Sequence, residues 1–355
     1  MIAYYAHQHG SGHANCAQLF AEASPEQVII FTSYAFSFSS GTQVVFLPSE
    51  DPDGTAAPSD TYDLPGYLHY SPVGQQSIQQ RSAVLLNECI AKDVKLLIID
   101  VSVEIAALAR ASSIPYAFVR LQGKRSDMAH LEAFRGAVFL LAYYPEALEM
   151  SETPKWVRDK TIYLGFLSRF PCLEIETGSK RLDTIAVLSG SGGNLGLTAI
   201  LPRLFKRFRH SKIDVFGDYK EMNISETVQY HGHRSDIYEY LKNADAIVTS
   251  CGLNTISELL HLKKTIIAIA EERPYQEQVC FLEQLIKEGL VSTTAFAMEN
   301  SDAAILNSIK DPSRFVGEEQ LKFFLEILSE NENIWELNLK ERINNNGVYI
   351  NHPSI

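Results

Sequence analysis

Short apolar runs alternate with segments of helical periodicity along most of this chain. In the first half, the runs that predict buried strands cover residues 2–6, 27–31, 43–47, 94–100, 116–120 and 137–141. The segments that predict helices cover residues 14–23, 77–90 and 103–111. Fully apolar strands alternating with helices are typical of a parallel sheet covered on both faces. A long loop rich in Pro, Asp and Tyr at 49–72 has the length that usually carries function.

The alternation breaks across residues 154–179 and then restarts. Strands are predicted at 184–188, 212–216, 246–249 and 264–269, with helices beginning at Leu195, Asp236, Thr255 and Tyr275 and an amphipathic helix at 318–329. We therefore predict an N-terminal Rossmann-like domain at 1–170, a C-terminal one at 171–330 and a tail at 331–355. The cleft between two such α/β domains facing each other is the expected ligand site.

Charge limits the classes of partner. The sequence has 31 Lys and Arg against 43 Asp and Glu, a formal net charge of −12 at pH 7. This sign opposes the neutralisation of phosphates on which nucleic-acid binding depends, so we expect no nucleic-acid partner. No Lys or Arg occurs between Met1 and Gln80. An anionic ligand is therefore expected to bind to later residues or to backbone amides.

The five cysteines are scattered along the chain and form no Cys-x-x-Cys pair. This pattern argues against a disulfide framework and against a zinc site, and it fits a reducing cytoplasm. No basic segment followed by an apolar one opens the chain, and no stretch approaches the roughly 20 apolar residues of a membrane span. We therefore expect a cytoplasmic protein.

The segment from Ser250 to Glu258 follows a predicted strand and opens a helix. Its glycine, Gly252, lets the backbone approach a ligand, and the amides at a helix N-terminus bind phosphate. Glu258, one turn inside the helix, is placed to accept hydrogen bonds from a vicinal diol. A simple capping box with a turn glycine is the alternative interpretation.

Two other loops of the second half carry weaker signals. Residues 189–193 (Ser-Gly-Ser-Gly-Gly) lie between a predicted strand and a helix, where backbone amides can bind an anion. Residues 230–237 (Tyr-His-Gly-His-Arg-Ser-Asp-Ile) lie at a strand end and could wrap around a base. An ordinary tight turn and a solvated charged turn are the alternatives.

His13 follows Gly10-Ser-Gly at the start of the first helix, where the helix dipole disfavours imidazolium and keeps the ring neutral for a general base. Asp100 ends the fourth strand at the same sheet edge and could hold the tautomer of His13. The alternative is a helix cap and a solvated strand end. His7 and His9 also invite a metal site, but strand and loop directions would splay the rings, so no metal is expected.

Taken together, these motifs resemble those of the GT-B nucleotide-sugar glycosyltransferases, which include the bacterial peptidoglycan-precursor N-acetylglucosaminyltransferases and plant small-molecule glucosyltransferases. The resemblance lies in residues 10–13, 189–193 and 250–258, followed by Glu277-Gln278. Residues 100–104 and 120–125 resemble bacterial glycosyltransferases whose acceptors are unassigned.

The resemblance implies roles for individual residues. The donor would be bound by Ser189, Ser191, Gly192, Gly193, Arg234, Ile237, Ser250, Gly252, Leu253, Asn254, Thr255, Glu258, Gln276, Glu277 and Gln278. Within this set, residues 252–255 would bind the diphosphate, and residues 191–193 would face the phosphates. Glu258 would bind the ribose, and Glu277 and Gln278 would bind the sugar. The loop around Arg234 would hold the base. His13 and Asp100 match the base and its supporting carboxylate. Gly12, His7 and Arg120 are the expected acceptor contacts.

The resemblance implies an inverting glycosyltransferase that needs neither metal nor cofactor. The expected donor is a UDP-sugar such as UDP-GlcNAc or UDP-glucose, and the acceptor is a small or lipid-linked compound with a hydroxyl group. A lipid-linked acceptor would bring peripheral contact with a membrane. A sugar-nucleotide 2-epimerase and a non-catalytic nucleotide-sugar sensor share the fold and remain alternatives.

Overall fold

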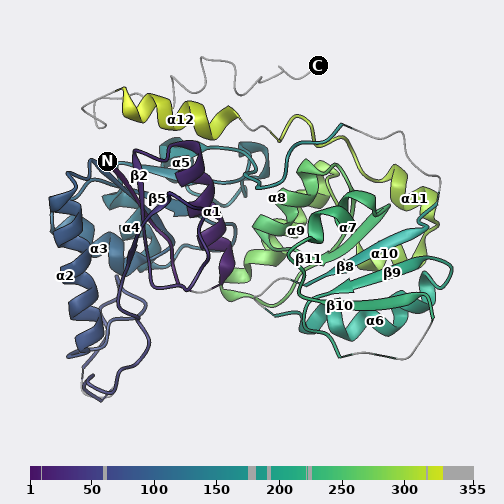
Figure 1. Ribbon diagram of the computed structural model, residues 1–355, viewed down its shortest axis with the longest axis horizontal. Helices are drawn as coiled ribbons and strands as arrows, with labels where there is room; N and C mark the ends of the chain where they lie inside the picture. The colour runs from purple at the N-terminus through teal and green to yellow at the C-terminus, as the bar shows by residue number, and fades with distance from the viewer. Residues whose placement is uncertain are drawn as a thin grey trace.

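The computed structural model describes residues 1–8, 10–58, 62–174, 181–189, 193–220, 222, 226–316 and 319–330. These residues form two α/β domains side by side (Figure 1). Each domain is a parallel sheet with helices on its two faces. The predicted fold class is therefore confirmed. In the described part of the chain, no helix is both long and apolar enough to cross a membrane.

Among the described residues, the first domain has a seven-stranded sheet in the order β3-β2-β1-β4-β5-β6-β7, paired in parallel throughout. Its strands are β1 (Ile2–Tyr5), β2 (Val28–Thr32), β3 (Gln43–Phe46), β4 (Leu96–Asp100), β5 (Tyr116–Arg120), β6 (Phe139–Ala142) and β7 (Thr161–Tyr163). Its helices are α1 (Ser11–Ala23), α2 (Gln76–Ala91), α3 (Val103–Ala111), α4 (Met128–Gly136) and α5 (Lys155–Lys160), with a 3₁₀ turn η1 (Glu146–Leu148).

The second domain has a six-stranded sheet in the order β10-β9-β8-β11-β12-β13 over the residues described. Its strands are β8 (Thr184–Leu188), β9 (Lys212–Phe216), β10 (Val228–Gly232), β11 (Ala246–Ser250), β12 (Thr265–Ile269) and β13 (Ser292–Thr293). Its helices are α6 (Leu195–Arg207), α7 (Ile237–Asn243), α8 (Leu253–His261), α9 (Glu277–Glu288), α10 (Thr294–Glu299) and α11 (Asp302–Asn307), with a 3₁₀ turn η2 (Pro274–Gln276).

The predicted strands agree closely with the observed ones because the central strands are buried on both faces and read as continuous apolar runs. All residues of β1, β2, β4 and β5 are buried. The sequence pattern did not predict several further elements, which are short or carry mixed polar and apolar residues: β7, β10, β13, α4, α5, α10 and α11. In α4, for example, Met128 is exposed while His130 is buried.

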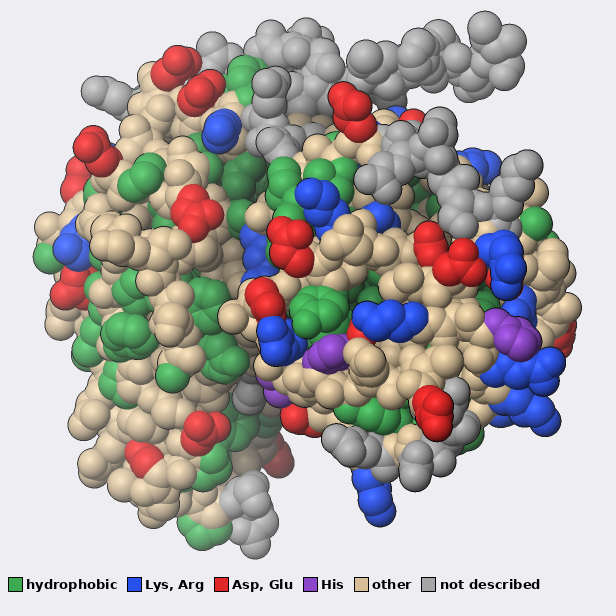
Figure 2. All heavy atoms as spheres, turned by 45° about the vertical axis from the view of Figure 1, so that its right-hand side comes forward, with side chains coloured by type: hydrophobic (Ala, Val, Ile, Leu, Met, Phe, Trp, Pro, Cys, Tyr) green, Lys and Arg blue, Asp and Glu red, His purple; other side chains and the backbone are tan. Residues whose placement is uncertain are grey.

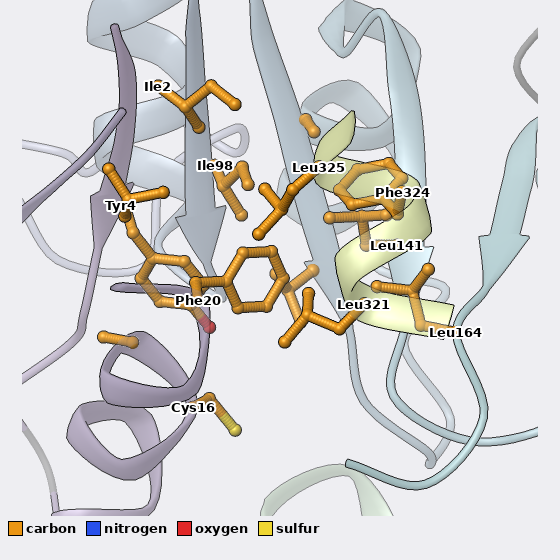
Figure 3. Close-up of a cluster of buried hydrophobic side chains, with 14 of the residues drawn as sticks. Ile2, Tyr4, Cys16, Phe20, Ile98, Leu141, Leu164, Leu321, Phe324 and Leu325 are labelled. Atoms are coloured by element: carbon orange, nitrogen blue, oxygen red, sulfur yellow. The ribbon is translucent and has the colours of Figure 1, made fainter. Parts of the chain in front are cut away.

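The last described helix, α12 (Glu319–Ser329), belongs to the core of the first domain, although the predicted boundaries count it with the second. Its apolar face packs against α1 and the sheet, with the rings of Phe324 and Phe20 6.5 Å apart (Figure 3). The segment that leads from the second domain back to α12 lies beside the segment that leads out of the first domain, and Phe166 and Val316 form a β-bridge there. This packing corrects the predicted division, because an amphipathic pattern predicts a helix but not which sheet covers its apolar face.

Candidate functional site

A cavity of about 700 Å³ lies between the two domains. Its wall is formed by loops at the carboxyl ends of strands in both sheets, including those after β1 and β4 in the first domain and β8, β9 and β11 in the second. Open parallel sheets bind ligands at this edge. Lys and Arg side chains gather on the second domain, whereas the face of the first domain in the same view carries few of them and shows scattered Asp and Glu among apolar side chains (Figure 2). This distribution matches the absence of Lys and Arg before residue 81.

His13 and Asp100 meet in the wall of this cavity. The Nδ1 atom of His13 lies 2.8 Å from Oδ2 of Asp100, and Asp100 is almost completely buried. The pair forms because β1 and β4 are adjacent parallel strands, so the loop after β1 and the end of β4 reach the same point. With Nδ1–H donated to the carboxylate, the lone pair of a neutral His13 ring lies on Nε2.

The electrostatics of His13 differ from the expectation based on the helix dipole. Burial lowers the pKa of His13, but the carboxylate of Asp100 outweighs burial and raises this pKa above its usual value. The neutral ring is therefore a stronger base than an isolated imidazole. It is also protonated over a wider range of pH, because Asp100 stabilises the imidazolium.

Two tyrosines and a strained residue fix the position of Asp100. The hydroxyl of Tyr4 donates to Oδ2 of Asp100 at 2.9 Å and lies 3.1 Å from the hydroxyl of Tyr143. Val101, directly after Asp100, has a φ of 66°, a left-handed conformation that a β-branched residue rarely adopts. Such strain is concentrated at functional sites.

Two helix N-termini open into the cavity without a side-chain cap. The capping positions of α1 and α8 are Gly10 and Gly252, which have no side chain to accept from the first amides. The two ends approach each other closely, because a Cβ atom at Gly12 would lie 2.6 Å from Nδ2 of Asn254. Backbone amides and helix dipoles at this point favour an anion. The predicted donor residues Ser250, Gly252, Leu253, Asn254 and Thr255 all contribute to this part of the cavity wall.

The N-terminus of α6, by contrast, already binds a carboxylate of the protein. The backbone N–H groups of Gly196 and Leu197 donate to Glu271 at 2.7 and 2.9 Å. Of the predicted phosphate loop before α6, Ser189 and Gly193 line the cavity, while Ser191 and Gly192 lie outside the described residues. The first amides of this helix therefore serve Glu271 in the described structure.

Three arginines line the described part of the wall. Arg273 follows β12 and donates to the carbonyl oxygen of Gly193 at 2.9 Å. Arg169, in the linker between the domains, forms an ion pair of 2.7 Å with Glu258. Burial raises the pKa of Glu258 and Arg169 opposes this shift. Arg169 and Arg273 were not predicted from the sequence, because neither lies in a motif. The only signal was the absence of Lys and Arg before residue 81, which indicated that cationic groups for an anionic ligand come from later residues.

The remaining predicted donor residues fall into two groups. Arg234, paired with Asp236, and Ile237 line one end of the cavity together with Phe216. Glu277 and Gln278 line the wall at the start of α9. Gln276 has a left-handed backbone in the turn before them, and among the described residues it is not part of the wall.

The predicted acceptor contacts are dispersed. Gly12 lines the cavity. Arg120 is buried in a two-fold contact with Glu149, at 2.9 and 3.1 Å, away from the described wall. The ring of His7 lies beside that of His13, with centroids 5.9 Å apart, and His7 is not among the described residues of the wall. Of the predicted metal candidates, His9 lies outside the described residues.

Within the described residues, one cluster has the composition of a metal site: His69, Asp127 and His130. Nδ1 of His130 lies 2.6 Å from Asp127, while its Nε2 lies 3.1 Å from a guanidinium nitrogen of Arg125. Because an arginine can only donate, Nε2 must be the acceptor and Nδ1 must carry the proton. Nδ1–H then donates to Asp127. The cluster is therefore a hydrogen-bonded chain in this arrangement.

No family model matches this sequence, and no curated protein sequence matches it either. Solved structures do match. UGT2 of Phytolacca americana, complexed with UDP-2fluoro-glucose and pterostilbene, is 12% identical over 95% of this chain and 99% of its own, with a TM-score of 0.61. The spinosyn rhamnosyltransferase SpnG, complexed with thymidine diphosphate, is 11% identical over 97% and 96%, with a TM-score of 0.56. Acinetobacter baumannii MurG is 13% identical over 96% and 94%, with a TM-score of 0.50. The chain thus has the predicted GT-B fold.

Proposed function

We propose that this protein is a glycosyltransferase that moves a sugar from a nucleoside diphosphate to a hydroxyl group of an acceptor. The observation that carries the proposal is the His13–Asp100 pair, which lies in the same cavity wall as the uncapped N-terminus of α8. One side offers a base, and the other offers an anion site. UGT2 and SpnG, which share the fold, were solved with UDP-2fluoro-glucose and thymidine diphosphate, and this supports a nucleotide-sugar donor.

In the proposed reaction, Nε2 of His13 takes the proton of the acceptor hydroxyl as its oxygen attacks the anomeric carbon of the donor sugar. A bond forms between that oxygen and the anomeric carbon. The bond from the anomeric carbon to the diphosphate oxygen breaks, and the diphosphate leaves with the electron pair. Direct displacement inverts the configuration of the sugar. Asp100 stabilises the imidazolium that results.

The leaving diphosphate would be stabilised by the amides at the start of α8 and by the guanidinium of Arg273. These groups supply the positive potential that many enzymes obtain from a metal ion, so the proposal requires neither metal nor cofactor. The proposed nucleotide is UDP, with the ribose hydroxyls donating to Glu258 and the base near Arg234 and Ile237. UDP-GlcNAc and UDP-glucose are the donors to test first.

The carboxylates of the cavity favour transfer over 2-epimerisation. An epimerase of this fold would need several carboxylates free to act on the sugar. The described carboxylates in the wall each have a cationic or imidazole partner: Asp100 has His13, Glu258 has Arg169, and Glu277 has Arg125. A non-catalytic sensor would not need the His13–Asp100 pair.

A thermal-shift panel of UDP, dTDP, GDP and their glucose and N-acetylglucosamine conjugates tests the donor. A ligand at 100 times its Kd stabilises the folded state by about 2.7 kcal/mol. We expect UDP and a UDP-sugar to give the largest shifts, and His13→Ala to show the same shift with UDP. NMR of the anomeric proton then reports whether the sugar released to water or to an acceptor has the inverted configuration. A panel without any shift would contradict the proposal.

A further inference from the structure

The loop after β5 in the first domain holds the turn before α9 in the second. The backbone N–H of Lys124 donates to the carbonyl oxygen of Tyr275 at 2.7 Å. Arg125 pairs with Glu277 at 2.9 Å, and its guanidinium lies over the ring of Tyr275, 4.8 Å from the centroid. Arg125 is largely buried, with 11% of its side chain exposed. A single arginine therefore connects the two domains at the cavity wall.

The turn that Arg125 contacts is strained. Tyr275 and Gln276 have φ angles of 58° and 55°, so two consecutive residues other than glycine adopt the left-handed conformation. Such a conformation is strained in residues other than glycine and persists only where the surroundings enforce it. The surroundings here come from the first domain. Gly123 allows the close approach, because a Cβ atom there would lie 2.8 Å from the Tyr275 carbonyl oxygen.

A chain of polar groups, which runs from the buried His130 to the exposed His69, lies beside Arg125. Its second guanidinium nitrogen contacts His130, which donates to Asp127. Asp127 also contacts His69 at 2.9 Å, and His69 lies 3.2 Å from the hydroxyl of Tyr275. The chain thus starts at Arg125 and returns to the second domain at Tyr275. These contacts hold the guanidinium of Arg125 in its orientation.

The two residues at the start of α9 have different anchors. Gln278 is held within its own domain, where its side-chain oxygen accepts from the backbone N–H of Glu271 at 2.9 Å. Glu277 is held by Arg125 of the other domain. Both residues line the cavity. The carboxylate therefore keeps its position in the wall through a contact that exists only while the domains meet.

We propose that Arg125 is a positioning residue that orients Glu277 towards the sugar of the donor, so that the first domain takes part in sugar recognition while the nucleotide is bound by the second. This inference rests on the proposed function. It places specificity for the sugar at the junction of the two domains, in the loop that carries Gly123 and Arg125, as well as in the loop that carries Glu277.

Isothermal titration calorimetry with UDP, UDP-glucose and UDP-GlcNAc tests the inference on the full chain. A hydrogen bond to a charged group is worth about 1.5–3 kcal/mol, so Arg125→Met should weaken binding of the preferred UDP-sugar by roughly 10- to 150-fold. UDP itself should bind as to the wild type. Glu277→Gln should show the same selective loss, and the double variant should bind the UDP-sugar no more weakly than Glu277→Gln alone.

Arg135→Met is the matched control, because Arg135 is an exposed arginine of the same domain that pairs with Glu132 at the surface. It should bind all three ligands as the wild type does. Equal losses for UDP and UDP-sugars in Arg125→Met, losses that add up in the double variant, or unchanged binding of the UDP-sugar would each overturn the inference while leaving the proposed function standing. A wild-type protein that binds none of the three ligands would overturn the proposed donor and this inference with it.

Discussion

Helices α6 and α8 follow neighbouring central strands of one sheet, and both are preceded by loops with small residues and glycine, yet their N-termini differ. Glu271 accepts from the first amides of α6. At α8 the capping position is Gly252, which has no side chain to accept from the first amides, and the first residues of the helix line the cavity. A glycine loop before a helix is therefore not sufficient for an anion site. What decides is whether another part of the chain already supplies the anion.

The largest expected effect is on kcat and comes from His13, which lies at the open N-terminus of α1. It distinguishes this helix end from that of α8, where the diphosphate is proposed to bind. General-base catalysis is worth about 100- to 10,000-fold, so His13→Ala should lower kcat within this range. Affinity for UDP should stay unchanged, because the proposed diphosphate site lies at α8. Steady-state kinetics with calorimetry measures both. A variant His13→Gln that retains most of the activity would contradict the role of His13 as base.

Removing the carboxylate of Glu271 tests whether the N-terminus of α6 is stabilised by this side chain rather than by a bound nucleotide. In Glu271→Ala, two amides lose their acceptor at about 1–3 kcal/mol each, so the free energy of unfolding should fall by roughly 3 kcal/mol. Denaturant unfolding measures this fall, with Glu271→Gln as an intermediate control because it keeps one acceptor oxygen. UDP affinity should change little. A large loss of UDP affinity in the folded variant would mean that α6 takes part in nucleotide binding.

A converse experiment gives α8 the internal anion that α6 has. Gly252 has φ −82° and ψ 135°, which other residues adopt freely, and a Cβ atom there would meet nothing within 4 Å. An Asp at this position would cap α8 and repel the diphosphate. Two charges about 4 Å apart near a protein surface interact by about 4 kcal/mol, so Gly252→Asp should weaken UDP binding at least tenfold.

The matched variant Gly252→Asn offers a cap of the same shape without the charge. Both substitutions should raise stability by a few tenths of a kcal/mol, at most about 1 kcal/mol, since Asp and Asn are better N-caps than Gly. Gly252→Asn should keep most of the affinity for UDP. Equal affinities of the two variants in calorimetry would show that charge at α8 does not matter.

The smallest expected effect is a shift along the pH axis. The proposed mechanism needs neutral His13, so kcat should rise with pH through the raised pKa of His13 and then level off. Asp100→Asn removes the carboxylate that raises this pKa, and the rising limb should therefore move to lower pH. A pH–kcat profile of both proteins measures the shift. A limb that stays in place would show that it belongs to another group.

The same contrast explains what the sequence could predict. His13 and Asp100 were predicted as a pair because adjacent parallel strands bring their carboxyl ends together, a rule that needs only the strand assignments. The capping of α6 by Glu271 joins residues 75 and 74 positions apart. Nothing in a glycine loop indicates which distant carboxylate reaches it. The contact of Arg125 with Glu277 spans 152 positions and has no local signal either.

The fold followed a similar division between local and distant information. Buried central strands were predicted within a residue or two, since burial on both faces leaves a continuous apolar run. The helix α12 was also predicted at nearly its observed bounds. Its partner was not, because an apolar helical face fits any apolar sheet of suitable shape. Arg120, expected at the acceptor, instead forms a buried ion pair with Glu149, a partner 29 positions away.

The packing of α12 on the first domain also bears on how the chain folds as it is synthesised. Phe20 and Phe139 are synthesised early, but they pack against Phe324, which leaves the ribosome only after the entire second domain. Until then, the nascent first domain exposes the apolar surface that α12 later covers. Exposed surface of this kind promotes aggregation and chaperone binding. The order of synthesis thus opposes independent folding of the first domain, although its sheet is continuous in sequence.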